Sequence, residues 1–251
     1  MKTRLLSRSD VVEIVRKVGH DALMDAMISS LTDVFLRYDS RAVEVRKRDG
    51  FNYDRCSRTL ISPEVAGGLL EWMPVLELGA ASTIKMVAYN PKNPARHGIP
   101  TIMATMFQHD IKTGHLVAIT DGADVPGKTE CPATVVDAAA LVCPDFRAQA
   151  IVEGECQQLP EDRIGPSLPQ IVKDRAHCKD YRSRLTIFDS TGFAREDKVA
   201  MELFLGYAEN FGLGTDVTIE STPLDPLDPY ALEIEPLMVR PADRGIGLRR
   251  N

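Results

Sequence analysis

Long apolar runs are missing from this sequence. No stretch approaches eighteen uncharged apolar residues, which argues against a transmembrane helix. The first ten residues, MKTRLLSRSD, lead into a charged helical pattern and lack the apolar region and small-residue cleavage site of an export signal. These absences predict a soluble, unexported protein of the cytoplasm without a membrane partner.

A surplus of basic residues is also missing. Acidic and basic residues are interspersed and give a formal net charge of -6, so no basic stripe is present that could neutralise nucleic-acid phosphates. We therefore expect no nucleic-acid partner. The one cationic cluster, residues 41 to 48 (RAVEVRKR), is more typical of a solvated face than of a binding site.

The five cysteines are scattered along the chain and form no CxxC pair. This spacing excludes a zinc-ribbon type of site and gives no support to a disulfide framework. We expect reduced thiols and no metal.

Apolar spacing near the N-terminus predicts two helices. Asp10 and Glu13 have the spacing of a capping box, and the apolar face that follows ends at Gly19. A second amphipathic pattern runs from Leu23 to about Tyr38.

Between Cys56 and Thr120 the pattern changes to short runs rich in Val, Ile, Leu and Thr, separated by Gly, Pro and Asn. The short connections require antiparallel neighbours, because a parallel pair needs a longer crossover. The loop DIKTG (110–114) is a natural hairpin turn. The predicted strands are 58–62, 68–73, 83–88, 100–109 and 115–120.

Beyond Gly122 the pattern is mixed. It predicts a helix around 134–141, a strand at 184–188 and a helix over 195–211. The last segment, 212–251, contains TPLDPLDPY and is typical of an extended tail.

Several phrases in a fixed order carry a resemblance. The N-terminal ones are Glu71-Trp72-Met73-Pro74, then Lys85, then NPKNPARHGIP (90–100), then Thr120-Asp121-Gly122. GADVPGKTE (122–130), VEGECQQL (152–159) and LTIFDSTGF (185–193) follow. Together they resemble the ornithine cyclodeaminase and mu-crystallin family over most of residues 1–211, with ornithine cyclodeaminases as the nearer branch.

The resemblance implies an α+β fold of unequal parts. Residues 1–122 and 195–211 would form a substrate-binding and dimerisation domain with a mostly antiparallel sheet. Residues 123–194 would be a truncated Rossmann-like remnant, followed by the tail 212–251. A homodimer is expected.

The substrate residues follow from chemistry and resemblance together. A guanidinium and an ammonium on a rigid sheet suit an amino-acid carboxylate, and Arg58 and Lys85 lie on adjacent predicted strands. By similarity to the family both bind that carboxylate. Glu71 would suit a second, cationic amine of an ornithine-like substrate. Asp124 matches the family's catalytic aspartate, which contacts the amine and transfers protons. The alternative is a purely structural role, in which Asp124 forms an Asx turn before Pro126.

The resemblance also implies a cofactor. Thr101, Lys128 and Ser190 match positions that contact NAD, which in the family carries the hydride while ornithine becomes proline and ammonia. The sequence nevertheless contains no G-x-G-x-x-G motif. Gly212-Leu213-Gly214 follows a predicted helix, where a cap is expected, and Gly245-Ile246-Gly247 lies in the tail.

A segment of the family pattern is absent at one point. Thr120-Asp121-Gly122 leads directly into Ala123-Asp124-Val125, where the family has a helix and the Gly-rich βαβ unit. Three functions therefore stay open: an ornithine cyclodeaminase-like enzyme, a non-enzymatic amino-acid-binding or dimerisation module, and a ketimine or imino-acid reductase of the mu-crystallin type.

Overall fold

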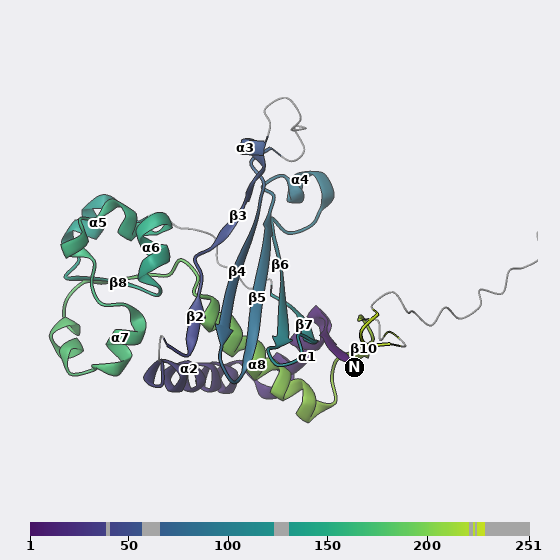
Figure 1. Cartoon of the computed structure of the whole chain (residues 1–251). Coiled ribbons are helices and arrows are strands. Elements are labelled where there is room, and N and C mark those ends of the chain that lie inside the picture. The colour runs from purple at the N-terminus through teal and green to yellow at the C-terminus, as the bar shows by residue number, and fades with distance from the viewer. Residues whose placement is uncertain (39–40, 57–65, 123–130, 221–222, 224, 229–251) are drawn as a thin grey trace, which may run out of the picture.

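The computed structural model describes residues 1–38, 41–56, 66–122, 131–220, 223 and 225–228. A large sheet forms the centre of the molecule, three long helices lie across its lower end, and a smaller unit lies to one side (Figure 1). Within the described residues, no helix has both the length and the apolarity needed to cross a bilayer.

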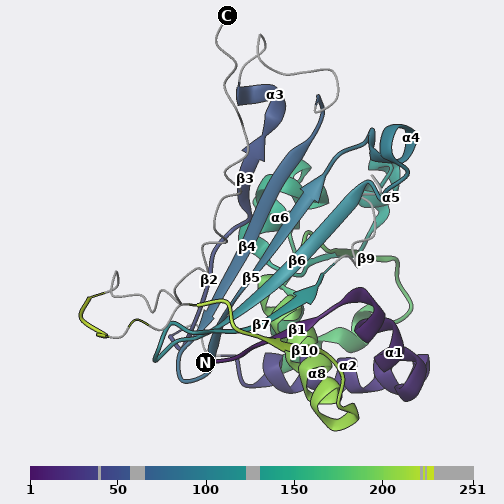
Figure 2. The same ribbon diagram turned by 90° about the vertical axis from the view of Figure 1, so that its right-hand side faces the viewer.

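The large sheet has the strand order β10-β1-β7-β6-β5-β4-β2, and β3 also pairs with β4. All of its pairings are antiparallel except β1 with β7. Figure 2 shows the long strands side by side. The predicted α+β class with a mostly antiparallel sheet is confirmed. The strands are β1 Thr3–Leu6, β2 Val43–Val45, β3 Asp49–Asn52, β4 Leu69–Glu77, β5 Ala81–Tyr89, β6 Ile102–Asp110, β7 Leu116–Asp121 and β10 Thr215–Val217.

Four of the predicted strands are present as β4, β5, β6 and β7, while the fifth, 58–62, lies outside the described residues. The predicted hairpin turn joins β6 and β7. Asp110 Oδ1 accepts hydrogen bonds from the backbone N–H groups of Lys112 and Thr113 at 3.0 and 2.8 Å, and Gly114 takes a φ of +75°. The side chain of Asp110 thus replaces backbone partners in the turn.

The three long helices are α1 (Arg8–Val18), α2 (His20–Leu36) and α8 (Ala194–Phe211). Helices α1 and α8 pack on the sheet, and α2 packs against both of them and against α7 (Leu168–Lys173). The predicted cap of the first helix was wrong by three residues. Ser7 is the N-cap, and its Oγ and backbone N–H are bonded to the backbone N–H and carboxylate of Asp10. Glu13 instead pairs with Arg16. Two short helices, α3 (Tyr53–Cys56) and α4 (Asn93–His97), lie at the upper end of the sheet (Figure 1).

Strand alternation decides which side chains face α8. Odd-numbered residues of β4 and β5 and even-numbered residues of β6 lie on one face, which includes the buried Met73, Val75 and Val87. Met106 and Ala118 of this face pack with Met201 of α8 in one apolar cluster. The same face also carries charged side chains, so a polar layer lies between the sheet and α8.

The smaller unit is built around a parallel pair, β8 (Leu141–Pro144) with β9 (Thr186–Asp189). Its helices are α5 (Ala133–Ala138), α6 (Arg147–Glu153) and α7 (Leu168–Lys173), with 3₁₀ turns at Glu155–Gln158, Glu161–Arg163 and His177–Tyr181. The helix predicted over 134–141 ends earlier, because Leu141 already begins β8. Val142, Ala150, Cys156 and Ile164 form its apolar core. A parallel strand pair flanked by helices is Rossmann-like, as expected.

Candidate functional site

Glu71 and Lys85, two predicted substrate residues, lie on the same face of adjacent strands. Met73 of β4 is paired with Lys85 of β5, and Glu71 is two residues from Met73 on the same face. Lys85 is only 8% exposed, and its Nζ lies 2.7 Å from Asp197 Oδ1 in the first turn of α8. A buried ammonium needs such a partner, so Asp197 fixes where the Lys85 ammonium lies.

Arg48 joins Glu71 to the smaller unit. Its Nη1 lies 3.4 Å from Glu71 Oε2 and 2.7 Å from Glu153 Oε1 at the end of α6. Its Nη2 donates to the carbonyl oxygen of Thr191, and its backbone N–H donates to Gln149 Oε1 at 2.8 Å. One side chain therefore contacts β4, α6 and the loop before α8.

The prediction of a solvated face for residues 41–48 was wrong for Arg48, whose side chain is 14% exposed. The prediction holds for Arg46, which is 75% exposed and pairs with Glu44. A cluster of cations in sequence carries no information about which member meets distant carboxylates, and here Glu71 and Glu153 are 23 and 105 residues from Arg48.

Asp145 holds the loop that supplies the Thr191 carbonyl. This fully buried carboxylate lies just after β8. It accepts hydrogen bonds from Ser190 Oγ at 3.3 Å, Thr191 Oγ1 at 3.1 Å and the Gly192 N–H at 2.8 Å. With these donors bonded to one buried carboxylate, the loop 190–192 is held next to Arg48 and Met73.

A second set of ion pairs also joins α8 to β4. Glu77 of β4 is bonded to Arg195 at 3.2 Å and to Lys198 at 2.9 Å, and Lys198 also contacts Glu202 at 2.5 Å. Burial would raise the pKa of Glu77, but the ion pairs with Lys198 and Arg195 hold it below its ordinary value. These contacts fasten the start of α8 to the end of β4.

Glu196 is the most perturbed acid of this layer. Burial raises its pKa to about 8, with further contributions from the negative charges of Asp145 and Asp197, while Lys85 acts in the opposite direction. At neutral pH this carboxyl is therefore mostly protonated. A proton-carrying acid beside a lysine is a common feature of functional sites.

The residues that the resemblance assigns to NAD do not gather in the described part of the chain. Thr101 precedes β6, where its carbonyl accepts from the Asn90 N–H at 2.9 Å, whereas Ser190 donates to Asp145. Lys128, like the predicted substrate residue Arg58 and the predicted catalytic Asp124, lies outside the described residues. Only Glu71, Lys85 and the Ser190 loop are brought to one region.

The turn after β8 does not fit a dinucleotide phosphate. A phosphate cradle needs glycines and free backbone N–H groups between a parallel strand and its helix. Here the turn reads Pro144-Asp145-Phe146; proline has no N–H, and the Phe146 N–H donates to the Asp145 carboxylate. This turn therefore supplies no cradle for the pyrophosphate of NAD.

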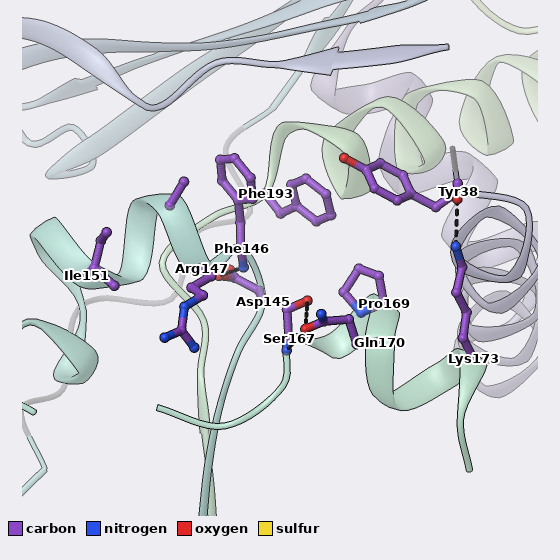
Figure 3. Close-up of a pocket in the computed structure, with 11 residues that line it drawn as sticks. Tyr38, Asp145, Phe146, Arg147, Ile151, Ser167, Pro169, Gln170, Lys173 and Phe193 are labelled. Carbon is purple, nitrogen blue, oxygen red and sulfur yellow. Dashed lines mark hydrogen bonds between the residues drawn. The ribbon is translucent and has the colours of Figure 1, made fainter. Parts of the chain in front are cut away.

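A cavity of about 490 Å³ lies beside this site, between the end of α2, the start of α6 and α7. Figure 3 shows Phe146, Phe193 and Tyr38 on one side and Pro169 and Gln170 on the other. Phe146 and Phe193 are stacked with ring centroids 5.1 Å apart. Neither Glu71 nor Lys85 lines this cavity.

Sequence reasoning missed Arg48, Asp145, Glu153, Glu196 and Asp197. Acids in the first turn of a helix are expected from the helix dipole alone, so Glu196 and Asp197 carried no distinguishing signal. Asp145 follows the apolar run Leu141–Pro144, which was not predicted as a strand. Had that strand been predicted, a polar residue at its carboxyl end would have been a signal, because such residues tend to lie at sites.

A model of the ornithine cyclodeaminase/mu-crystallin family matches residues 8–123 and 121–209. The chain belongs to this family. The two matches meet at Asp121-Gly122-Ala123, the point at which the sequence lacks the Gly-rich unit. Membership supports a function of the cyclodeaminase or imino-acid reductase type.

Among curated relatives, the L-lysine cyclodeaminase of Streptomyces rapamycinicus is 26% identical over 353 positions, covering 92% of this chain and all of the relative. Since 92% of this chain is about 231 residues, about 122 positions of that alignment have no residue of this chain. The ornithine cyclodeaminase of Brucella suis is 31% identical over 118 residues, covering 47% of this chain and 32% of the relative.

Solved structures have a similar fold. A lysine cyclodeaminase solved for its recognition of L-lysine, L-ornithine and L-2,4-diaminobutyric acid has a TM-score of 0.79 and 28% identity, covering 93% of this chain and all of that one. An archaeal alanine dehydrogenase dimer with bound NAD has a TM-score of 0.67 and 15% identity, covering 87% of this chain and all of that one, and shows the shared fold.

Proposed function

We propose that this chain binds a basic α-amino acid with a second amine, of the lysine and ornithine class, on the sheet face that carries Glu71 and Lys85. The single observation behind the proposal is that the Glu71 carboxylate and the buried Lys85 ammonium lie on one face of adjacent strands. Glu71 is two residues from Met73, the residue that pairs with Lys85. These two charges are complementary to the two ends of such an amino acid.

The spacing supports the same ligand class. Diagonal neighbours on one face of an antiparallel pair lie about 7–8 Å apart. From standard bond lengths, an extended lysine measures roughly 7 Å between its carboxyl carbon and its terminal nitrogen. The spacing of the two strand positions and the length of the ligand are of the same order, which supports a ligand whose carboxylate meets Lys85 and whose distal ammonium meets Glu71.

Further contacts come from the family resemblance and are part of the proposal. Arg58 would add a guanidinium to the carboxylate, and Asp124 would accept a hydrogen bond from the α-amine. The relative with 28% identity recognises diamino acids of three chain lengths, and we extend the same ligand class to this chain.

Titration calorimetry tests the proposal. The chain is titrated with L-lysine, L-ornithine and L-norleucine, an apolar control that has the lysine skeleton without the terminal amine. We expect saturable heat with the two basic amino acids and none with norleucine, and loss of that heat in Glu71→Gln. Equal responses to lysine and norleucine, or none to any ligand up to tens of millimolar, would refute it.

A second candidate function is turnover as a cyclodeaminase, which would convert ornithine to proline, or lysine to its six-membered homologue, with release of ammonia. The alignment with L-lysine cyclodeaminase over 92% of the chain favours it, whereas the turn after β8 argues against tight NAD binding. Mass spectrometry of the purified chain for NAD, together with an ammonia assay, separates this enzyme from a binding module. An imino-acid reductase would instead consume NADH with a cyclic imine.

We also propose that the other face of the large sheet pairs two copies of the chain. Trp72, Met86, Met103 and Phe107 lie on that face by strand alternation, and none of them is buried. Phe51 of β3, 56% exposed, makes an edge contact with Trp72. Light scattering of the native chain and of Trp72→Glu tests it: a native monomer would refute the pairing.

A further inference from the structure

The contacts of the Arg48 guanidinium define a cation site. Its acceptors are Glu71 Oε2 on β4, Glu153 Oε1 on α6 and the carbonyl oxygen of Thr191, and all three contact Nη1 or Nη2 of Arg48. The acceptors come from three separate elements that fold together around one charge. We call these three groups the cation site.

The backbone is shaped to admit this charge. Gly192, next to the Thr191 carbonyl, has a φ of +99°. A Cβ at this position would lie 2.9 Å from Arg48 Nη2 and 3.2 Å from Met73 Sδ. Glycine is therefore required both by the backbone conformation and by the close approach of the guanidinium.

Arginine is an imperfect occupant of the cation site. Its Nε is buried and has no hydrogen-bond partner among the described residues, which costs free energy because a desolvated charged donor is left unpaired. An alkyl ammonium has three donors and no others. Three oxygen acceptors around one position match an ammonium better than they match the five donors of a guanidinium.

The surroundings favour a cationic occupant. In the layer between the sheet, α6 and α8, the described carboxyl groups outnumber the cations. Leaving aside Glu196, whose carboxyl is mostly protonated at neutral pH, the carboxyl groups are Glu71, Glu77, Asp145, Glu153, Asp197 and Glu202, and the cations are Arg48, Lys85, Arg195 and Lys198. If Arg48 left the cation site without a replacement, Glu71 and Glu153 would each lose an ion-pair partner at low exposure, which is unfavourable.

We propose that Arg48 is an internal stand-in for the side-chain ammonium of the bound amino acid, so that Arg48 and the ligand exclude one another at Glu71 and Glu153. Glu153 is thereby a second carboxylate for the ligand's distal amine, and Arg48 sets the affinity by competition. The identity of the ligand rests on the function proposed above. The cation site itself does not, because any small guanidinium or ammonium can probe it.

The experiment removes the competing side chain. Arg48→Ala is compared with the native chain and with Arg46→Ala, a matched control two residues away whose arginine is exposed. Thermal unfolding is followed with methylguanidinium chloride and with sodium chloride at equal ionic strength. In parallel, calorimetry measures the dissociation constants of L-lysine and L-norleucine. Arg48→Met, which keeps an apolar stem for packing, is the second variant.

We expect methylguanidinium to raise the unfolding temperature of Arg48→Ala selectively and to leave the native chain and Arg46→Ala unchanged relative to sodium chloride. We also expect L-lysine to bind Arg48→Ala about tenfold more tightly than it binds the native chain, because the variant has no guanidinium to displace from Glu71 and Glu153. The affinity for L-norleucine should be the same in Arg48→Ala and in the native chain.

The outcomes separate this inference from the proposed function. Rescue by methylguanidinium without any lysine binding would establish the cation site and refute amino-acid binding. A folded Arg48→Ala or Arg48→Met that ignores methylguanidinium would overturn the cation site. Lysine binding with equal, measurable affinity to native and variant chains would overturn the competition between Arg48 and the ligand. If both variants are unfolded alone, folding induced by methylguanidinium supports the site, and its failure overturns it.

Discussion

Replacing Glu196 by glutamine should change how the stability of the chain depends on pH. In the folded chain its pKa is about 8, chiefly because of burial and then because of Asp145 and Asp197, against an ordinary value of 4.5. A folded-state pKa above the unfolded one means that the folded chain binds the proton more tightly. Stability from this group is therefore greatest at low pH and declines as pH rises from about 4.5 to about 8.

The magnitude follows from the same two values. Each pKa unit corresponds to about 1.4 kcal/mol, so the decline across this window is on the order of 5 kcal/mol. Glutamine has the shape of the protonated acid and no charge to desolvate. We expect Glu196→Gln to match the native chain at pH 4.5 within about 1 kcal/mol and to exceed its stability by several kcal/mol at pH 9.

Urea unfolding at a series of pH values from 4.5 to 9 measures the difference directly. Glu209→Gln, at the exposed end of the same helix α8, is the control and should follow the native curve. Taking the difference between native and variant cancels the other titrating groups. A difference between native and Glu196→Gln that stays constant with pH would refute the buried, protonated state of Glu196.

Three further predictions follow from other contacts. Lys85→Met leaves its aspartate partner unpaired and should lower the free energy of unfolding by about 3 kcal/mol, as read from urea midpoints; an unchanged midpoint would contradict the buried ion pair. Chiefly through burial, the pKa of the Cys143 and Cys156 thiols is raised to about 12. Because the thiolate is the reactive form, a thiol reagent at pH 8 should modify these two cysteines only after unfolding. Hydrogen bonds to the Lys2 carbonyl and to a glutamate partner raise the pKa of His115. The stability that these bonds contribute should be complete below pH 6.5 and be lost as pH rises through the folded-state pKa. Urea unfolding should therefore show that His115→Gln lowers the free energy of unfolding at low pH and lowers it less at high pH.

The long strands and helices were predictable because they carry strong local patterns. β4 to β7 lie in short runs rich in Val, Ile, Leu and Thr that are separated by turn residues, and α8 has an apolar face of several turns. The short strands β1, β2 and β3 were not predicted, because three or four residues are too few for a period to be visible. They form only because long-range partners such as β7 and β4 supply their hydrogen bonds.

The candidate site was predictable in part. Glu71 and Lys85 were identified by the family phrase and by the chemistry of carboxylate binding, and strand register brings them to one face. The role of Arg48 was not predictable, because its partner Glu153 belongs to another unit of the fold. The first cap was misplaced since both Ser7 and Asp10 are good cap residues, and only the backbone decides between them.

A crystal structure of Arg48→Ala grown with L-lysine tests the central claim most directly. The account predicts the lysine carboxylate at Lys85 and its terminal ammonium between Glu71 and Glu153, in the place that the guanidinium leaves. Lysine bound instead in the cavity beside Tyr38 and Phe193, or turned so that its carboxylate meets the glutamates, would contradict it.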